Sequence, residues 1–99
     1  MSLVIVGGHD RMHDEYKDIC CRRGHSAKVY TQMPPRFEKA LGSPDGIILF
    51  TSTVSHQMIR IAVKEAKRKR IPLLRCHSSS GTSLEGLLYE MERKKGLGQ

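Results

Sequence analysis

Two apolar runs, at residues 3–6 and 47–50, constrain the fold of this chain more than any other feature of its sequence. Both contain β-branched residues and neither alternates with polar residues, a pattern typical of strands that are covered on both faces. Residues 27–31 alternate in polarity and indicate a half-exposed edge strand, and residues 71–76 indicate a fourth strand. Helical periodicity follows each of these strands. The sequence therefore predicts a strand followed by a helix, four times over.

Capping residues indicate where the helices begin. Asp10 is expected to cap the first helix, and Thr53 is expected to cap the third. Thr82 and Glu85 have the spacing of a capping box at the start of the fourth helix. The second helix is expected to be short and to follow the two prolines at positions 34 and 35.

Apolar strands joined by helices predict a parallel sheet with helices on both faces, because each crossover connection is right-handed. For four strands we expect the order 2-1-3-4, as in the first four units of a flavodoxin-like fold. This order places the two continuous apolar runs at the centre and the alternating strand at an edge. We therefore expect one small Rossmann-like α/β domain over residues 1–99, with residues 95–99 as a frayed tail.

The charge of the chain favours anionic partners. Seventeen Lys and Arg residues stand against ten Asp and Glu residues, which gives a formal net charge of +7. Such a surface attracts anions in general, among them phosphorylated metabolites, nucleic acid, acidic membranes and acidic proteins. The chain has only three Tyr and two Phe residues and no Trp, which disfavours a dedicated nucleic-acid binder.

The cysteines and the hydropathy favour a cytoplasmic protein. Three cysteines, two of them adjacent at positions 20 and 21, do not form a disulfide framework, and no CxxC pair is present for zinc or thiol exchange. No apolar stretch approaches the length of a membrane span. The first residues lead directly into a strand, so we expect neither a signal peptide nor a membrane partner.

Three loops should meet at the end of the sheet where the carboxyl ends of the parallel strands lie, which we call the rim. Ligands of such folds bind there, at the point where the strand order reverses. The candidate ligand-binding residues on these loops are Gly7, Gly8, His9, Ser52, Thr53, Ser55, His56, His77, Ser78, Ser79 and Ser80. The glycine pair lacks the spacing of a dinucleotide-binding GxGxxG motif, although it would allow close approach of a ligand. The serine run precedes a helix and can donate hydrogen bonds to a phosphate or carboxylate. We therefore expect a small anionic ligand in one cavity with the serine run and His56.

The histidines on these loops leave several chemistries open. At the start of a helix, His56 should be neutral, and it could act as an acid/base, bind a metal or serve as an axial haem ligand. Together with His9 and His77 it could form a three-nitrogen metal site, although no HxH or HExxH spacing supports one. No GxSxG motif accompanies Ser55, which disfavours a hydrolase. We expect binding or sensing without catalysis, with haem, a divalent metal or a small enzyme reaction at His56 as alternatives.

The third helix has an unusually wide apolar face. Seven residues between positions 54 and 66 cover about 200° of its circumference, roughly twice what packing on one sheet requires. A second copy of the chain is the simplest partner, so we expect a homodimer through Met58, Ile59 and Val63. A basic run that begins at Lys64 and ends at Arg70 offers nucleic-acid binding as a further alternative.

Three segments resemble a known bacterial family. They are Val4-Ile5-Val6-Gly7-Gly8, Val54-Ser55-His56, and Leu74-Arg75 with the hydroxyl run at residues 78–83. Over nearly its whole length the chain is similar to the family called domain of unknown function 2325, and residues 46–56 look like its short, free-standing members. The resemblance implies the α/β fold and a site at the carboxyl ends of the strands, but the family has no agreed activity. Longer relatives have an acidic residue where this chain has Ser52, so a mechanism that needs that carboxylate does not carry over.

Overall fold

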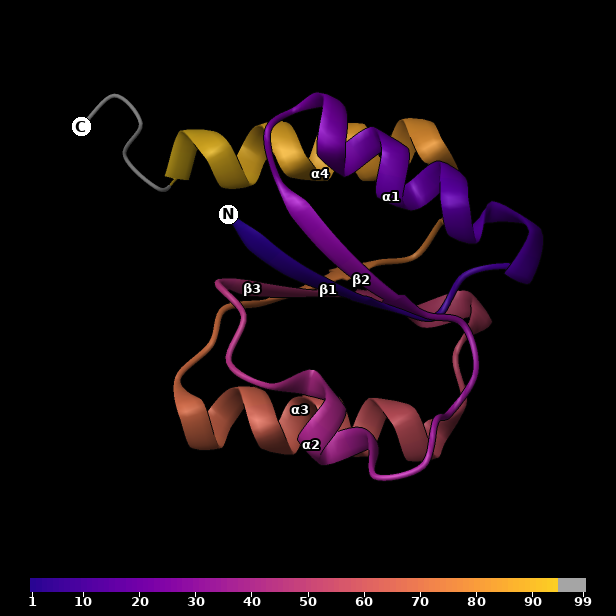
Figure 1. The fold of residues 1–99 in the computed structure, drawn as a ribbon, viewed down its shortest axis with the longest axis vertical. Helices are drawn as coiled ribbons and strands as arrows, with labels where there is room; N and C mark the ends of the chain where they lie inside the picture. The colour runs from indigo at the N-terminus through magenta and orange to yellow at the C-terminus, as the bar shows by residue number, and fades with distance from the viewer. Residues whose placement is uncertain (95–99) are drawn as a thin grey trace.

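The computed structural model describes residues 1–94, and its elements alternate as the sequence predicts (Figure 1). The strands are β1 (Ser2–Val6), β2 (Ser26–Tyr30), β3 (Gly46–Phe50) and β4 (Leu73–Cys76). The helices are α1 (His13–Arg22), α2 (Phe37–Leu41), α3 (His56–Lys69) and α4 (Gly81–Lys94), with 3-10 turns η1 (Asp10–Met12) and η2 (Thr51–Thr53). The tail expected at residues 95–99 lies outside the described residues.

The sheet has the predicted topology. Its four strands are all parallel and lie in the order β2-β1-β3-β4. Helices α1 and α4 cover one face, and α2 and α3 cover the other (Figure 1). Strand β4 is shorter than expected because its first paired residue, Leu73, follows Pro72, which has no N–H to donate. The α/β fold with strand order 2-1-3-4 is thus confirmed.

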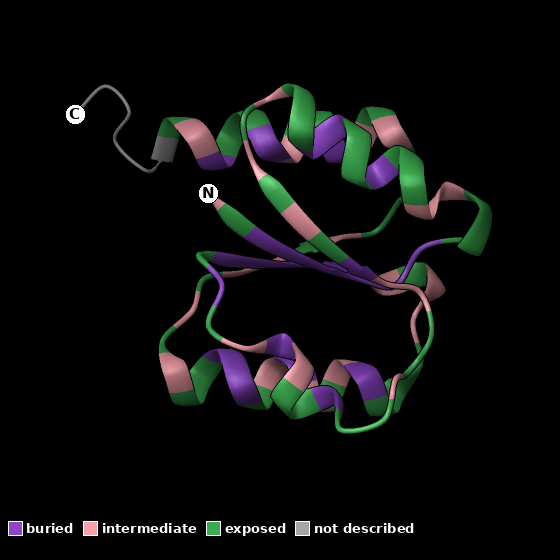
Figure 2. Cartoon of the chain, viewed as in Figure 1, coloured by how far each residue is buried: buried purple, intermediate pink, exposed green. Residues whose placement is uncertain are grey.

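The core lies in two layers, one on each face of the sheet (Figure 2). Along β3, which is buried throughout, Ile48 and Phe50 pack toward α1 and α4, whereas Ile47 and Leu49 pack toward α2 and α3. The edge strand β2 buries only Val29. The difference follows from position, since a central parallel strand has helices on both faces and an edge strand is partly open.

Three of the expected helix caps are wrong. Helix α3 is capped by Ser55, whose Oγ accepts a hydrogen bond of 3.2 Å from the N–H of Met58, because the turn η2 separates Thr53 from the helix. Helix α4 begins earlier than Thr82, and Ser80 Oγ accepts from the N–H of Ser83 at 3.1 Å. The carboxylate of Asp10 accepts hydrogen bonds from the end of β2 and does not cap α1.

A charge cluster ties the start of β2 to α4. The guanidinium of Arg23 donates to both carboxylate oxygens of Glu92, at 2.9 and 2.6 Å, and His25 Nε2 lies 2.8 Å from the same group. The hydrogen bonds from Arg23 outweigh the effect of burial and lower the pKa of Glu92 to about 2. Among the described residues, no helix is long and apolar enough to cross a membrane.

Candidate functional site

The loops that follow β1, β3 and β4 meet at one rim of the sheet, as the sequence predicts. The N–H of Gly8 donates to Thr53 Oγ1 at 2.9 Å, which joins the first loop to the second. Ser52 Oγ donates to the carbonyl oxygen of His77 at 2.5 Å, which joins the second loop to the third. The rim is therefore one connected surface.

The glycine pair at the rim is required by packing. Gly7 and Gly8 have φ angles of +101° and +92°, which side chains of L-residues rarely adopt. A Cβ on Gly8 would lie 2.6 Å from a ring carbon of Tyr16, and a Cβ on Gly7 would lie 3.0 Å from the carbonyl oxygen of Phe50. Tyr16 therefore fills the space above Gly8. The close approach that the two glycines allow is taken by Tyr16 and by the backbone of Phe50, and not by a ligand.

The loop of residues 77–80, which we call the serine loop, is held in place by hydrogen bonds to its backbone carbonyl oxygens and between its own side chains. The hydroxyl of Tyr16 donates to the carbonyl oxygen of Ser79 at 2.7 Å, and Cys76 Sγ lies 3.0 Å from that of Ser78. Within the loop, the hydroxyls of Ser78 and Ser80 lie 3.2 Å apart. The hydroxyls are thus prepositioned before any ligand arrives.

A pocket of about 390 Å³ lies beside this loop, and we call it the rim pocket. It is lined by His9, Arg11, Met12, Ser78, Ser79, Ser80 and Gly81. Among the described residues, no Asp or Glu is one of its lining residues, but the carboxylate of Glu15 lies beside Gly81, 3.2 Å from where a Cβ on that glycine would be. The nearby Asp10 is engaged by Thr31 and Gln32, and these hydrogen bonds, that from Thr31 above all, lower the pKa of its carboxyl. The pocket therefore combines hydroxyl donors with a guanidinium and an imidazole.

Arg11 and Met12 were not identified as site residues from the sequence. The helical periodicity that follows Asp10 had suggested one continuous helix, whereas the structure places both residues in the turn η1. The available signal was proximity in sequence, because Arg11 lies only two residues after His9 and is the first cation after β1.

The predicted site residues fall into three groups. His9, Ser78, Ser79 and Ser80 line the rim pocket. Gly7, Gly8, Ser52, Thr53 and Ser55 make the backbone turns, caps and loop contacts described above. His56 and His77 are exposed and lie outside the rim pocket.

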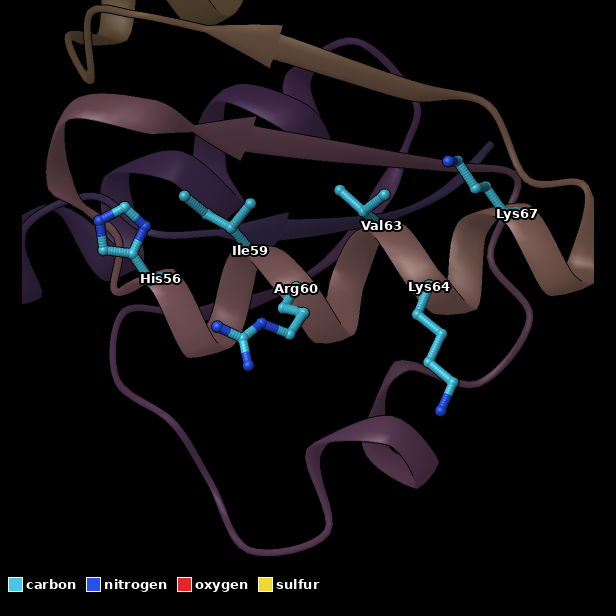
Figure 3. A pocket seen from close by; sticks show the side chains of 6 residues that line it. All are labelled: His56, Ile59, Arg60, Val63, Lys64 and Lys67. Atoms are coloured by element: carbon cyan, nitrogen blue, oxygen red, sulfur yellow. The ribbon is translucent and has the colours of Figure 1, made fainter.

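His56 lies in a different pocket, so the expectation that it shares a cavity with the serine run is wrong. It is the first residue of α3, and it lines a pocket of about 540 Å³ with Ile59, Arg60, Val63, Lys64 and Lys67 (Figure 3). The reason is that α3 and α4 cover opposite faces of the sheet, so their first residues lie on different sides of the rim. Within residues 1–94, no three His, Cys, Asp or Glu side chains are placed to hold a metal ion. His9, His56 and His77 therefore do not lie close enough together to form the three-nitrogen site.

The basic run on α3 divides into two groups. Glu65 is buried, and its carboxylate pairs with Arg68 at 2.7 Å and with Lys69 at 3.5 Å. These contacts, first of all the hydrogen bond from Arg68, lower the pKa of Glu65. Lys64 and Lys67 are not paired with Glu65, and they line the pocket that contains His56.

The wide apolar face of α3 also divides. Met58 is buried in the core of its own chain, whereas Ile59 and Val63 are half-buried and line the pocket beside the helix. Met58 is therefore not available to a partner. The homodimer stays a prediction.

The comparisons with known proteins identify a family. The model of a family described as an uncharacterized protein conserved in bacteria (DUF2325) matches residues 2–91. Neither the curated proteins nor the solved structures include a significant match. The matched segment contains all four strands and every residue of the rim pocket, so the resemblance seen in the sequence is confirmed. This chain belongs to the bacterial family DUF2325, a family of unknown function.

Proposed function

We propose that this domain is a binding or sensing module that holds a small anionic ligand in the rim pocket without catalysing a reaction. One observation carries the proposal: Arg11, His9 and the serine loop line the same pocket, and within residues 1–94 no carboxylate is among its lining residues. A guanidinium can pair with two oxygens of a phosphate or carboxylate at once. The ligand class is therefore an oxyanion or a small molecule that carries one.

Helix α4 adds to the preference for an anion. It is 14 residues long and begins at Gly81, directly beside the serine loop. The first N–H groups of a helix have no partner within the helix, and its N-terminus carries a partial positive charge. Ser80 Oγ accepts from the N–H of Ser83. The carboxylate of Glu15 also lies at this helix start, so an anionic ligand would compete with it for the first N–H groups of α4.

The arrangement of hydroxyls supports binding over catalysis. A serine nucleophile needs a neighbouring base within hydrogen-bond reach. Among the described residues, Ser52 donates to the backbone carbonyl of His77 and Ser55 accepts from the backbone N–H of Met58, and neither hydroxyl is bonded to a histidine ring. His56 lies outside the rim pocket. The acid/base role of His56 and its haem or metal binding stay predictions, which an absorbance titration of wild type and His56→Ala with haem or Co²⁺ would test.

The test is a titration with inorganic phosphate and pyrophosphate, followed by NMR chemical shifts. We expect shifts centred on residues 9–12 and 78–82, and we expect Arg11→Ala to weaken binding about tenfold. Lys17→Ala is the matched control, because Lys17 is an exposed cation on the same side of the sheet but outside the pocket. Equal losses in the two variants, or shifts centred elsewhere, would contradict the proposal.

A further inference from the structure

A second surface, independent of the rim pocket, follows α3 and reaches the edge strand β4 beside the C-terminal half of that helix. The pocket that contains His56 shares Val63 and Lys67 with a neighbouring pocket of about 380 Å³. We call the two together the α3–β4 groove. Its lining residues are His56, Ile59, Arg60, Val63, Lys64, Ala66, Lys67, Arg70, Ile71, Leu73 and Arg75.

The floor of the α3–β4 groove is apolar and only half-covered. On the other face of the sheet, Leu74 and Cys76 of β4 pack against the core beneath α4. On this face, α2 lies on the far side of α3, where Lys69 Nζ donates to the carbonyl oxygen of Gly42 at 2.6 Å. Helix α3 covers Leu73 only in part, so Leu73 stays half-buried although its neighbour on β3, Ile47, is fully buried.

Four aliphatic side chains form this floor: Ile59, Val63, Ile71 and Leu73. All four are half-buried, so each keeps apolar surface in contact with water. Figure 3 shows Ile59 and Val63 one turn apart on α3, both pointing toward the strands. Covering such a strip with another apolar surface is favourable.

The charged residues along the borders of the α3–β4 groove are all basic. Five basic residues line it, namely Arg60, Lys64, Lys67, Arg70 and Arg75. No acidic residue lines it, and none of the five forms an ion pair with another residue of the described segment. Arg68 and Lys69, in contrast, both pair with the buried carboxylate of Glu65.

We propose that the α3–β4 groove docks an acidic amphipathic helix of another protein. An apolar strip between basic borders is complementary to a helix with aliphatic residues on one face and carboxylates beside them. A helix as long as α3, which has 14 residues, spans about 21 Å and could follow the groove along its length.

Two other occupants fit the surface less well. A second copy related by a two-fold axis would bring basic borders against basic borders, which is unfavourable. Single-stranded nucleic acid binds through basic grooves with aromatic side chains on which bases stack. Among the described residues that line this groove, none is aromatic other than His56. The aliphatic floor of the groove would face the phosphates of a nucleic acid and make no favourable contact with them.

The first part of the test uses two labelled synthetic peptides of about 18 residues, which is long enough to cover the groove as a helix. One has Leu at helical spacing with Glu at the other positions, and the second has the same composition in an order without that spacing. In fluorescence anisotropy we expect the amphipathic peptide to bind at least about tenfold more tightly than the permuted one. Equal binding would overturn the proposal, because it would show attraction to charge without recognition of the apolar floor.

The second part locates the binding surface with two variants of equal charge. Arg60→Glu/Lys64→Glu/Lys67→Glu reverses three exposed cations of the groove, and Lys17→Glu/Lys28→Glu/Lys39→Glu reverses three exposed cations elsewhere. We expect the first variant to lose at least about tenfold in peptide affinity and the second to stay within about twofold. Equal losses would overturn the proposal. So would tighter binding of a single-stranded DNA of about 20 nucleotides, or a wild-type dimer in sedimentation equilibrium that only the groove variant dissociates. None of these outcomes depends on phosphate binding in the rim pocket.

Discussion

The hydroxyl of Tyr16 donates a hydrogen bond of 2.7 Å to the carbonyl oxygen of Ser79 and so joins helix α1 to the loop that lines the rim pocket. The Tyr16 ring is fully buried, lies over Gly8 and contacts Phe50 at a centroid distance of 5.1 Å. One side chain therefore links the first rim loop, the core and the serine loop. The shape of the proposed anion site depends on this residue, although Tyr16 does not line the pocket itself.

The first prediction concerns that hydroxyl. Tyr16→Phe keeps the ring in place but leaves the Ser79 carbonyl oxygen without this donor, so we expect a loss of about 1 kcal/mol in the free energy of unfolding. Amide exchange at residues 78–81 should become faster. Urea denaturation and hydrogen-exchange mass spectrometry measure the two effects. Tyr89→Phe is the control, because Tyr89 is 56% exposed, and equal changes in both variants would contradict the prediction.

The second prediction separates packing from backbone strain at a glycine. Gly8 and Gly24 have similar φ angles, +92° and +83°, so alanine should cost about 1–2 kcal/mol in backbone strain at either position. Only at Gly8 would the new Cβ meet a neighbour, at 2.6 Å from the Tyr16 ring, whereas Gly24 has nothing within 4 Å.

We therefore expect Gly8→Ala to lower the free energy of unfolding by about 3 kcal/mol or more, and Gly24→Ala by about 1–2 kcal/mol. Chemical denaturation of the two variants measures the difference. Similar losses would show that the contact with Tyr16 relaxes without cost.

Much of the fold was predictable because burial separates the central strands from the edge strands. The continuous apolar runs at residues 3–6 and 47–50 require helices on both faces, and only central strands have them. The alternation at residues 27–31 is compatible only with an edge. The helix caps were less predictable, because several neighbouring hydroxyls compete near each helix start and a 3-10 turn such as η2 shifts the cap by two residues without a compositional signal.

The position of the site at the carboxyl ends of the strands was predictable, but which side chains share a pocket there was not. Parallel strands bring their carboxyl ends to one edge, which correctly placed His9 near the serine run. Which face of the sheet each following helix covers depends on the crossovers and on packing, and this choice placed His56 in a separate pocket. Arg11 was missed because its segment has helical periodicity, which does not distinguish a 3-10 turn from the first turn of a helix.

The third prediction concerns the adjacent cysteines of α1. Cys20 is fully buried, and burial raises the pKa of its thiol from the ordinary value of 9.0 to about 11, whereas Cys21 is exposed. At pH 8 only about one Cys20 in a thousand would be the reactive thiolate. We expect iodoacetamide to modify Cys21 at this pH and to leave Cys20 unmodified until the protein is unfolded in urea. Peptide mass spectrometry measures both sites, and equal rates in the folded protein would contradict the buried position of Cys20.

The last prediction concerns the charge cluster around Glu92. Its carboxylate accepts two hydrogen bonds from Arg23, which lower its pKa from the ordinary value of 4.5 to about 2. Because the pKa is lower in the folded state, the ionised carboxylate stabilises the fold. This contribution is fully present above pH 4.5 and is lost as the pH falls from 4.5 toward 2.

Glu92→Gln removes the charge with little change in shape, so we expect the free energy of unfolding to fall by about 1–2 kcal/mol at pH 7. The difference from wild type should shrink as the pH is lowered toward 2, where wild type has lost the same charge. Glu90→Gln is the matched control, since Glu90 is an exposed residue of the same helix. Urea denaturation of the three proteins between pH 7 and the acid limit of folding measures the effect. If the difference between Glu92→Gln and wild type stays constant with pH, the ion pair with Arg23 is not the source of the stability.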